Sequence, residues 1–179
     1  MARFPGHILG DAPGKVLPEF FPGFAQGRSY DPDMVRELHP GEVEEILREE
    51  IVGRIGCTGE RGIYIVPIVY AYDGTFIFGY SADGMKVEYM RKDPAVCFQV
   101  DRVEDAANWR SVIAWGTYEE LEDGEADHAV ERLSLRLRTL ANRNSVESMR
   151  SYVLRSGQPG VAYRIRLREK TGRIAVAGT

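Results

Sequence analysis

The sequence predicts a mainly β fold, a small antiparallel barrel of six strands with helices, and three observations support this. Six runs of β-rich or alternating residues occur, several of them joined by links short enough for hairpins. No strand–helix–strand repeat occurs, which disfavours a doubly wound parallel sheet. The chain has 179 residues, of which 44% are hydrophobic and 28% charged, a composition typical of one globular domain with a sizeable core.

The predicted strands are defined by their alternation and by the turn residues between them. Asp73-Gly74 separates the second strand from the third and predicts a tight hairpin, since glycine adopts a positive φ without strain. Pro67 removes a backbone amide from the second strand, which indicates a sheet edge or a bulge. The six strands are residues 53–58, 63–72, 75–80, 95–101, 109–121 and 161–168.

Three helices are predicted from apolar residues at helical spacing. The first begins at Pro40, where a missing amide is tolerated, and extends to about residue 51. The second, 84–92, ends before Asp93-Pro94, because a residue that precedes proline disfavours the helical region. The third covers 125–142. The residues expected to face the core are Val43, Ile46, Leu47, Ile51, Met85, Val87, Met90, Ala129, Val130, Leu133, Leu137 and Leu140.

Residues 1–35 are predicted to form an irregular arm before a single domain over 36–179. Prolines alternate with glycines in the arm, and its periodicity is neither helical nor extended. The arm nevertheless contains Phe4, Phe20, Phe21 and Phe24. We expect these rings to anchor it on the body of the protein or across a partner subunit.

Composition excludes several classes of protein. The net charge is −4 and no long basic run occurs, so nucleic-acid binding is not expected. No apolar run approaches the roughly 20 residues of a membrane span and no signal peptide begins the chain, so we expect a cytoplasmic protein. Cys57 and Cys97 lie within predicted strands and are expected to be buried thiols, with a disulfide or a reactive thiol as alternatives.

The sequence contains no complete catalytic motif. Neither a Gly-rich loop for nucleoside triphosphates nor a dinucleotide-binding Gly-x-Gly-x-x-Gly is present. His7, His39 and His128 lie in the arm, at a helix start and on a helix, so a zinc site or a Ser–His–Asp triad lacks its parts. No metal site and no catalytic residue are predicted, and any chemistry is expected to come from a bound cofactor.

A phosphate site is predicted where the third strand runs into the second helix. The segment Ser81-Ala82-Asp83-Gly84-Met85-Lys86 is a turn of small residues that leads into a helix with a lysine in its first turn. Free amides and the positive helix end attract an anion, and Lys86 adds a charge. The alternative is that Lys86 is a solvated surface lysine and that Ser81 and Asp83 only cap the helix.

Several segments together carry a family resemblance. Residues 66–74, 76–86 and 90–101 resemble the pyridoxamine-phosphate-oxidase-like FMN-binding proteins, most closely the branch of the nitroimidazole-resistance flavoproteins. Residues 109–116, 163–166 and 171–173 continue the pattern, which covers about 36–173. In the segment 109–116, packing explains the two tryptophans about as well as a cofactor does.

The resemblance implies a six-stranded split barrel that forms a homodimer, with FMN in two clefts at the interface. Backbone groups of residues 66–69 would line the flavin ring, and Ser81, Met85 and Lys86 would meet the phosphate. Ser111 would approach from a neighbouring strand, while Arg54, Tyr80 and Trp115 would shape the open face of the ring. The cofactor-binding residues so implied are Val66, Pro67, Ile68, Val69, Tyr80, Ser81, Met85, Lys86, Ser111 and Trp115.

The expected function is that of an FMN-dependent oxidoreductase, which passes electrons from reduced flavin to a small oxidised substrate such as a nitroaromatic or quinone. Tyr80 stands where many relatives have a histidine, and the arginine-rich substrate signature of the true oxidase is missing, so oxidation of vitamin B6 is not expected. The alternatives are a non-catalytic flavin carrier or sensor, or the same barrel with haem or a deazaflavin in place of FMN. For a deazaflavin, the three arginines within residues 164–168 could form the basic groove that its acidic tail needs.

Overall fold

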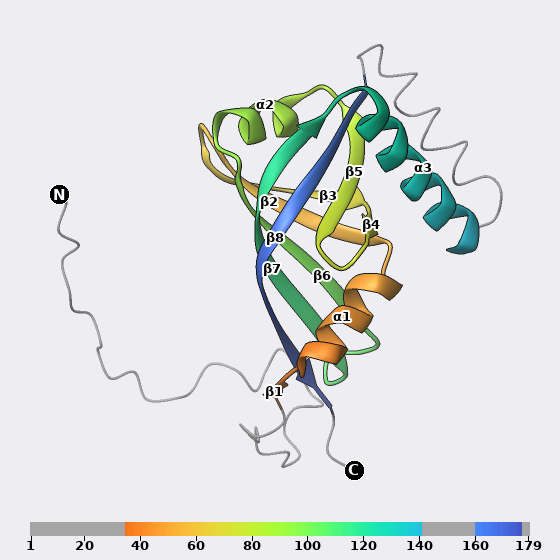
Figure 1. Ribbon diagram of the computed structural model, residues 1–179. Helices are drawn as coiled ribbons and strands as arrows, with labels where there is room; N and C mark the ends of the chain where they lie inside the picture. Colours follow the sequence, from red (N-terminus) through yellow and green to blue (C-terminus); the bar gives the residue numbers. More distant parts are fainter. Residues whose placement is uncertain (1–34, 141–159, 177–179) are drawn as a thin grey trace, which may run out of the picture. The chain divides into compact units, whose positions relative to one another are not determined.

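The computed structural model describes residues 35–140 and 160–176 (Figure 1). The arm predicted over 1–35, apart from its last residue, and the end of the third predicted helix therefore lie outside the described residues. The elements are β1 (Val35–Glu37), α1 (Pro40–Glu49), β2 (Val52–Gly59), β3 (Gly62–Val69), β4 (Ala71–Tyr72), β5 (Phe76–Ala82), α2 (Met85–Lys92), β6 (Ala95–Val103), β7 (Trp109–Leu121), α3 (Asp123–Leu140) and β8 (Gly160–Ala175).

All strands within residues 35–140 and 160–176 belong to one sheet. Its order is β3-β2-β6-β7-β8-β5-β4, with β1 added on β8, and every pair is antiparallel. The mainly β, antiparallel class is thus confirmed. The count of six strands is wrong, because the sheet has eight. The short β1 was missed because its stability comes from pairing with residues 173–175, which no local pattern reveals.

The predicted hairpin around Asp73-Gly74 exists, but its first arm is much shorter than expected. Gly74 has the positive φ of 106° that the turn requires, and Asp73 Oδ1 accepts hydrogen bonds from the amides of Thr75 and Phe76. Only the two residues of β4 pair with β5, whereas β3 pairs along its whole length with β2. The strand breaks at Tyr70, whose amide donates to Ile51 O (3.0 Å) and whose buried ring packs on Phe98.

β3 forms an edge of the sheet, and β8 is longer than predicted. β3 is an edge strand, so the inference drawn from Pro67 is confirmed. β8 extends seven residues beyond the predicted end at Arg168, to Ala175. This extension carries polar residues that do not alternate with apolar ones, and a β-bulge opposite Trp115 and Gly116 shifts its register against β7.

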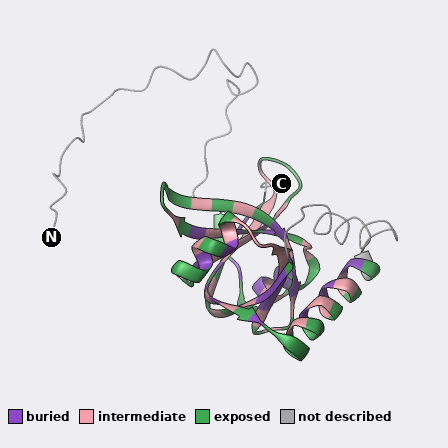
Figure 2. Cartoon of the chain, turned by 90° about the horizontal axis from the view of Figure 1, so that it is seen from above, coloured by how far each residue is buried: buried purple, intermediate pink, exposed green. Residues whose placement is uncertain are grey.

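The helices cover the ends and one side of the sheet, which curls around a buried core (Figures 1 and 2). α1 and α2 insert fully buried side chains, including Leu47 and Met90, into the main core. α3 packs outside β5 through Ala129 and Leu133. Met85 was expected to face the core but is 52% exposed. It is the first residue of α2, and the residues of this helix that face the core, Val87 and Met90, come later. None of the helices among the described residues is both long and apolar enough to cross a membrane.

Candidate functional site

The start of α2 carries a cation that no described carboxylate neutralises. Lys86 is the second residue of the helix, where the first amides have no partner within the helix. Its amine lies 6.0 Å from the centroid of the Tyr163 ring, and burial lowers its pKa. By contrast, Arg91 on the same helix pairs with both Asp83 and Glu120. A half-buried lysine that no described acid neutralises is the residue of α2 best placed to meet an anionic ligand.

Two hydroxyl groups beside Lys86 are buried without a partner. Neither Ser81 Oγ nor Tyr163 Oη has a hydrogen-bond partner among the described residues. Tyr163 pairs with Gly79 across the sheet, and a Cβ at residue 79 would lie 2.3 Å from its ring. The glycine therefore lets the tyrosine side chain cross over β5 toward Ser81. Buried hydroxyls in folded proteins nearly always have a partner, and the lowering effect of Ser81 on the pKa of Tyr163 places these two hydroxyls near each other.

We call Ser81, Lys86 and Tyr163 the anion pocket. It combines one ammonium group and two hydroxyl donors with the amino-terminal end of a helix, which is the donor set that a phosphate group requires. Burial raises the pKa of Tyr163 to about 12, and Ser81 opposes that rise in part. The phenol is therefore a neutral hydrogen-bond donor at physiological pH.

Cys57 lies close enough to act on the charge of Lys86, and it remains a thiol. Its Sγ donates to Tyr64 O at 3.8 Å, and burial raises its pKa. Cys57 and Cys97 are both free, the first buried and the second half-buried. The prediction of buried thiols is thus confirmed for Cys57, and a disulfide between the two is not formed.

Tyr80, predicted to shape the open face of the flavin ring, and Met85, predicted to meet the phosphate, are placed as follows. Tyr80 lies between Gly79 and Ser81 in β5, so its side chain is on the opposite face, where it packs against the cluster below α3. Its hydroxyl also fills the space beside Gly160, where an added Cβ would clash with it. Met85 is exposed at the start of α2. Of the predicted residues, the structure brings together Ser81 and Lys86.

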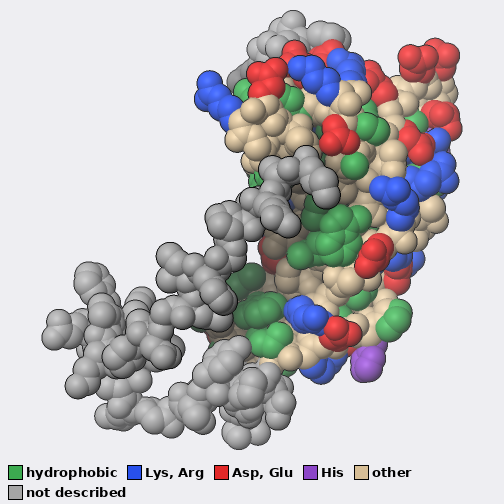
Figure 3. Space-filling model, turned by 90° about the vertical axis from the view of Figure 1, so that its left-hand side faces the viewer, with side chains coloured by type: hydrophobic (Ala, Val, Ile, Leu, Met, Phe, Trp, Pro, Cys, Tyr) green, Lys and Arg blue, Asp and Glu red, His purple; other side chains and the backbone are tan. Residues whose placement is uncertain are grey.

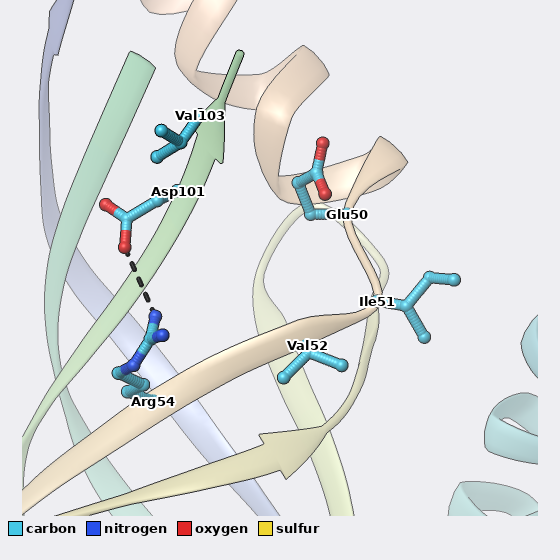
Figure 4. A pocket seen from close by; sticks show the side chains of 6 residues that line it. All are labelled: Glu50, Ile51, Val52, Arg54, Asp101 and Val103. Carbon is cyan, nitrogen blue, oxygen red and sulfur yellow. Dashed lines mark hydrogen bonds and ion pairs between the residues drawn. The ribbon is translucent and has the colours of Figure 1, made fainter. Parts of the chain in front are cut away.

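The residues predicted to line the flavin ring lie at the opposite end of β2 and β3. Pro67 pairs with Arg54, and Val69 pairs with Val52. Arg54 forms an ion pair with Asp101 at 3.2 Å (Figure 4). A pocket of about 380 Å³ lies here, between the end of α1 and strands β2 and β6. Its lining residues are Glu50, Ile51, Val52, Arg54, Asp101 and Val103.

Ser111 and Trp115 lie on the same sheet as this pocket. Ser111 pairs with Asp101, one of the lining residues. Trp115 pairs with Cys97 and is 41% exposed. Within one chain, the strand 66–69 and the anion pocket lie toward opposite ends of β2. Val52, the first residue of β2, pairs with Val69 and follows α1, whereas Gly59, the last residue of β2, contacts α2.

The outer face of β3, β2, β6 and β7 exposes large apolar side chains. The cross-strand pairs Ile65–Gly56, Gly56–Cys97 and Cys97–Trp115 form one row across the four strands. Figure 3 shows hydrophobic side chains gathered in patches on the side of the molecule that it presents. We call this face the outer sheet surface. Its most exposed hydrophobic residues are Val52, Ile63, Ile65, Val103 and Trp115.

Sequence reasoning missed two parts of these sites. Tyr163 was placed in the strand 161–168 and in the segment 163–166 of the family resemblance without a role, and its position over Gly79 depends on a pairing between strands far apart in the sequence. The carboxylates Glu50 and Asp101, which line the pocket, were also missed, because they belong to no recognisable sequence motif. A glycine in a β-rich strand is a signal of close approach that could have drawn attention to residue 79.

The antiparallel sheet with its three helices defines a split-barrel protein, and the anion pocket lies at the start of α2. Residues 39–174 match the model of the pyridoxamine 5'-phosphate oxidase family. The match covers most of the chain, which therefore belongs to this family.

Individual relatives agree with that assignment. A FAD-binding protein from Mesorhizobium loti is 32% identical, with a TM-score of 0.61 over 79% of this chain and 98% of that one. A Bacteroides thetaiotaomicron protein with a proposed role in 5-nitroimidazole antibiotic resistance shares the fold at 18% identity, with a TM-score of 0.60 over 78% and 87% of the two chains. An uncharacterised protein of Rhizobium meliloti is 31% identical over 94 residues, 52% of this chain and 62% of that protein. The chain thus matches less than two thirds of this curated relative's length.

Proposed function

We propose that the protein binds a flavin nucleotide, FMN, with its phosphate in the anion pocket. The observation that carries the proposal is the convergence of the unneutralised Lys86 amine with the unpartnered hydroxyls of Ser81 and Tyr163. A phosphate would satisfy all three groups at once and would accept hydrogen bonds from the helix amides. Membership of the pyridoxamine 5'-phosphate oxidase family supports the same cofactor class.

The choice between FMN and FAD is decided by the molecule that the purified protein carries. Flavin absorption bands, followed by chromatography of the heat-released cofactor, identify it directly. We expect FMN, because the anion pocket provides one lysine for one phosphate. FAD is the second candidate, supported by the FAD-binding relative from M. loti. A Soret band would point to haem, and a colourless protein that does not take up added FMN would contradict the proposal.

A deazaflavin is a weaker candidate for a reason that the structure supplies. Its acidic tail would need free basic groups, but Arg164 and Arg166 both pair with Glu119 at 2.6 and 3.0 Å. Arg164 also pairs with Glu125. These two side chains are therefore engaged in ion pairs on the outside of the sheet.

We also propose that two copies of the chain associate through the outer sheet surface. Its exposed apolar residues and the separation of the anion pocket from the strand 66–69 support a shared site, in which each copy contributes one group. Ile65, 62% exposed, lies near the middle of β3 on this surface.

Ile65→Lys is expected to convert the dimer to a monomer and to release flavin, because a charge would be buried in an apolar interface. Sedimentation velocity measures the change in mass. Leu135→Lys, at an exposed position of α3, is the matched control and should stay dimeric. A wild-type monomer, or a dimeric I65K protein, would contradict this interface.

We propose an oxidoreductase activity for the loaded protein. When bound, flavin supplies the electron chemistry, accepting two electrons as a hydride from a nicotinamide donor and passing two electrons to an acceptor such as a quinone or nitroaromatic. The chain's residues hold the cofactor and shape access to it, with the pocket beside Arg54 and Asp101 as the candidate entry for substrate. NADPH-driven turnover with nitroaromatics or quinones tests this. Tight flavin binding without turnover would instead support a carrier or sensor.

A further inference from the structure

Arg91 binds two carboxylates, and one of them belongs to the turn that leads into α2. Its Nε and Nη2 atoms donate to the two carboxylate oxygens of Glu120 in β7, each at 2.7 Å. Its Nη1 atom donates to both oxygens of Asp83, at 2.9 and 3.0 Å. Glu120 also accepts a hydrogen bond from the hydroxyl of Tyr118 at 3.2 Å. The guanidinium is thus fixed on a strand of the sheet, and the Asp83 carboxylate is bound to it.

Asp83 is an acid at the place where an acid would compete with a bound anion. It lies two residues after Ser81 and three before Lys86, and it precedes Gly84, the N-cap residue of α2. Acidic side chains are favoured at helix starts, where they often cap the free amides. Among the described residues, however, no side chain caps α2. The start of the helix is therefore open to a ligand, because the nearest carboxylate in the sequence is bound to Arg91.

We propose that Arg91 is a positioning residue of the anion pocket, which holds the Asp83 carboxylate away from the start of α2 and neutralises it. This inference rests on the proposed function, because it concerns the binding of the phosphate in the same pocket. Without Arg91, a negative charge three residues from Lys86 would repel the phosphate and would compete with it for the helix amides. Arg91 acts on the phosphate through Asp83 and not by direct contact.

The test compares the affinities of FMN and riboflavin, which differ by the phosphate. Arg91→Met is expected to weaken FMN roughly threefold to tenfold, the effect of one charge at a partly buried helix start, and to leave riboflavin almost unchanged. Arg36→Met is the matched control. Arg36 donates to both carboxylate oxygens of Glu42 at the start of α1, at 2.8 and 2.7 Å, and its loss should leave the ratio of FMN to riboflavin affinity unchanged.

Removal of Asp83 separates this role from that of an anchor for the turn. Asp83→Ala alone should keep or raise the FMN affinity, because it removes the acid that Arg91 holds. The double variant with Arg91→Met should recover most of the affinity that Arg91→Met loses. If the ion pair instead keeps the turn in shape, Asp83→Ala would weaken FMN as much as Arg91→Met does, and the double variant would recover nothing. Either of these two results would overturn the inference.

Salt provides a further readout that a purely structural role would not move. The Asp83 side chain is 30% exposed, so its repulsion of the phosphate should be screened by ions. The difference in FMN affinity between the wild type and R91M should therefore shrink as the ionic strength rises. A difference that does not change with salt would contradict the role of Asp83. A wild-type protein that binds FMN no better than riboflavin would instead overturn the proposed function.

Discussion

Lys86→Met is expected to weaken FMN roughly tenfold to a hundredfold, which corresponds to the loss of one charge-assisted contact of about 1.5–3 kcal/mol. Riboflavin should bind almost equally to both proteins, because it lacks the group that Lys86 meets. Methionine keeps an unbranched apolar side chain of similar length and removes the charge. Fluorescence titration of the apoprotein with each flavin measures the two affinities.

The same substitution has a second expected consequence, in the absence of ligand. Because burial lowers the pKa of Lys86, its charged form is less favourable in the folded chain than in the unfolded chain. The ligand-free K86M protein should therefore be more stable than the wild type near neutral pH. This difference should shrink as the pH rises toward the ordinary lysine pKa, where the amine is increasingly neutral in both states.

A matched control lies on the same helix. Lys92 is exposed and pairs with Glu60 at 3.5 Å, so Lys92→Met should change neither flavin affinity nor the preference for FMN. Equal losses of FMN and riboflavin in K86M would contradict the assignment of Lys86 to the phosphate. They would point to a general change in the shape of the cleft.

Gly79→Ala is expected to lower the free energy of unfolding by about 1–3 kcal/mol, the usual range for overpacking a well-packed core. The added Cβ would stand 2.3–2.5 Å from the Tyr163 ring and its hydroxyl. That ring is fully buried against Tyr118 and cannot move into solvent. Urea unfolding of the apoprotein measures the loss, and a lower preference for FMN should accompany it because the anion pocket is displaced.

The control for this substitution is a glycine with free space around it. Gly41 lies in the first turn of α1, with nothing within 4 Å of an added Cβ. Gly41→Ala should be neutral or slightly stabilising, since alanine has the higher helix propensity. A G79A protein as stable as G41A would show that Tyr163 does not lie over residue 79 as described.

Local patterns predicted much of the fold. The helix starting at Pro40, the turn at Gly74 and the edge strand at Pro67 follow from backbone properties that proline and glycine carry into any context. The strands β5, β6 and β7 were also found, because their residues alternate between apolar and polar. The first arm of the predicted hairpin was too long, since alternation shows that residues 63–72 are extended but not which strand they pair with.

Part of the candidate site was predicted because two of its residues are close together in the sequence. Ser81 and Lys86 lie five residues apart at a strand-to-helix junction, so local sequence reveals their proximity. Tyr80 was predicted to shape the open face of the flavin ring, but a strand sends neighbouring side chains to opposite faces, and its ring packs against the cluster that contains Ala129 and Leu133 of α3. The location of Met85 in the exposed first position of α2 could have been anticipated only from the exact start of that helix.

By itself, then, the sequence determined the antiparallel class, most of the element boundaries and the junction that holds Lys86, because each depends on the conformational preferences of neighbouring residues. The tertiary structure alone decided that Tyr163 lies over Gly79, that Arg54 meets Asp101, and that apolar residues of four strands share one outer face. The contacts between Tyr163 and Gly79 and between Arg54 and Asp101 join residues that are 84 and 47 positions apart. Their geometry comes from the register of the sheet, which is set by the packing of the whole core and not by any single segment.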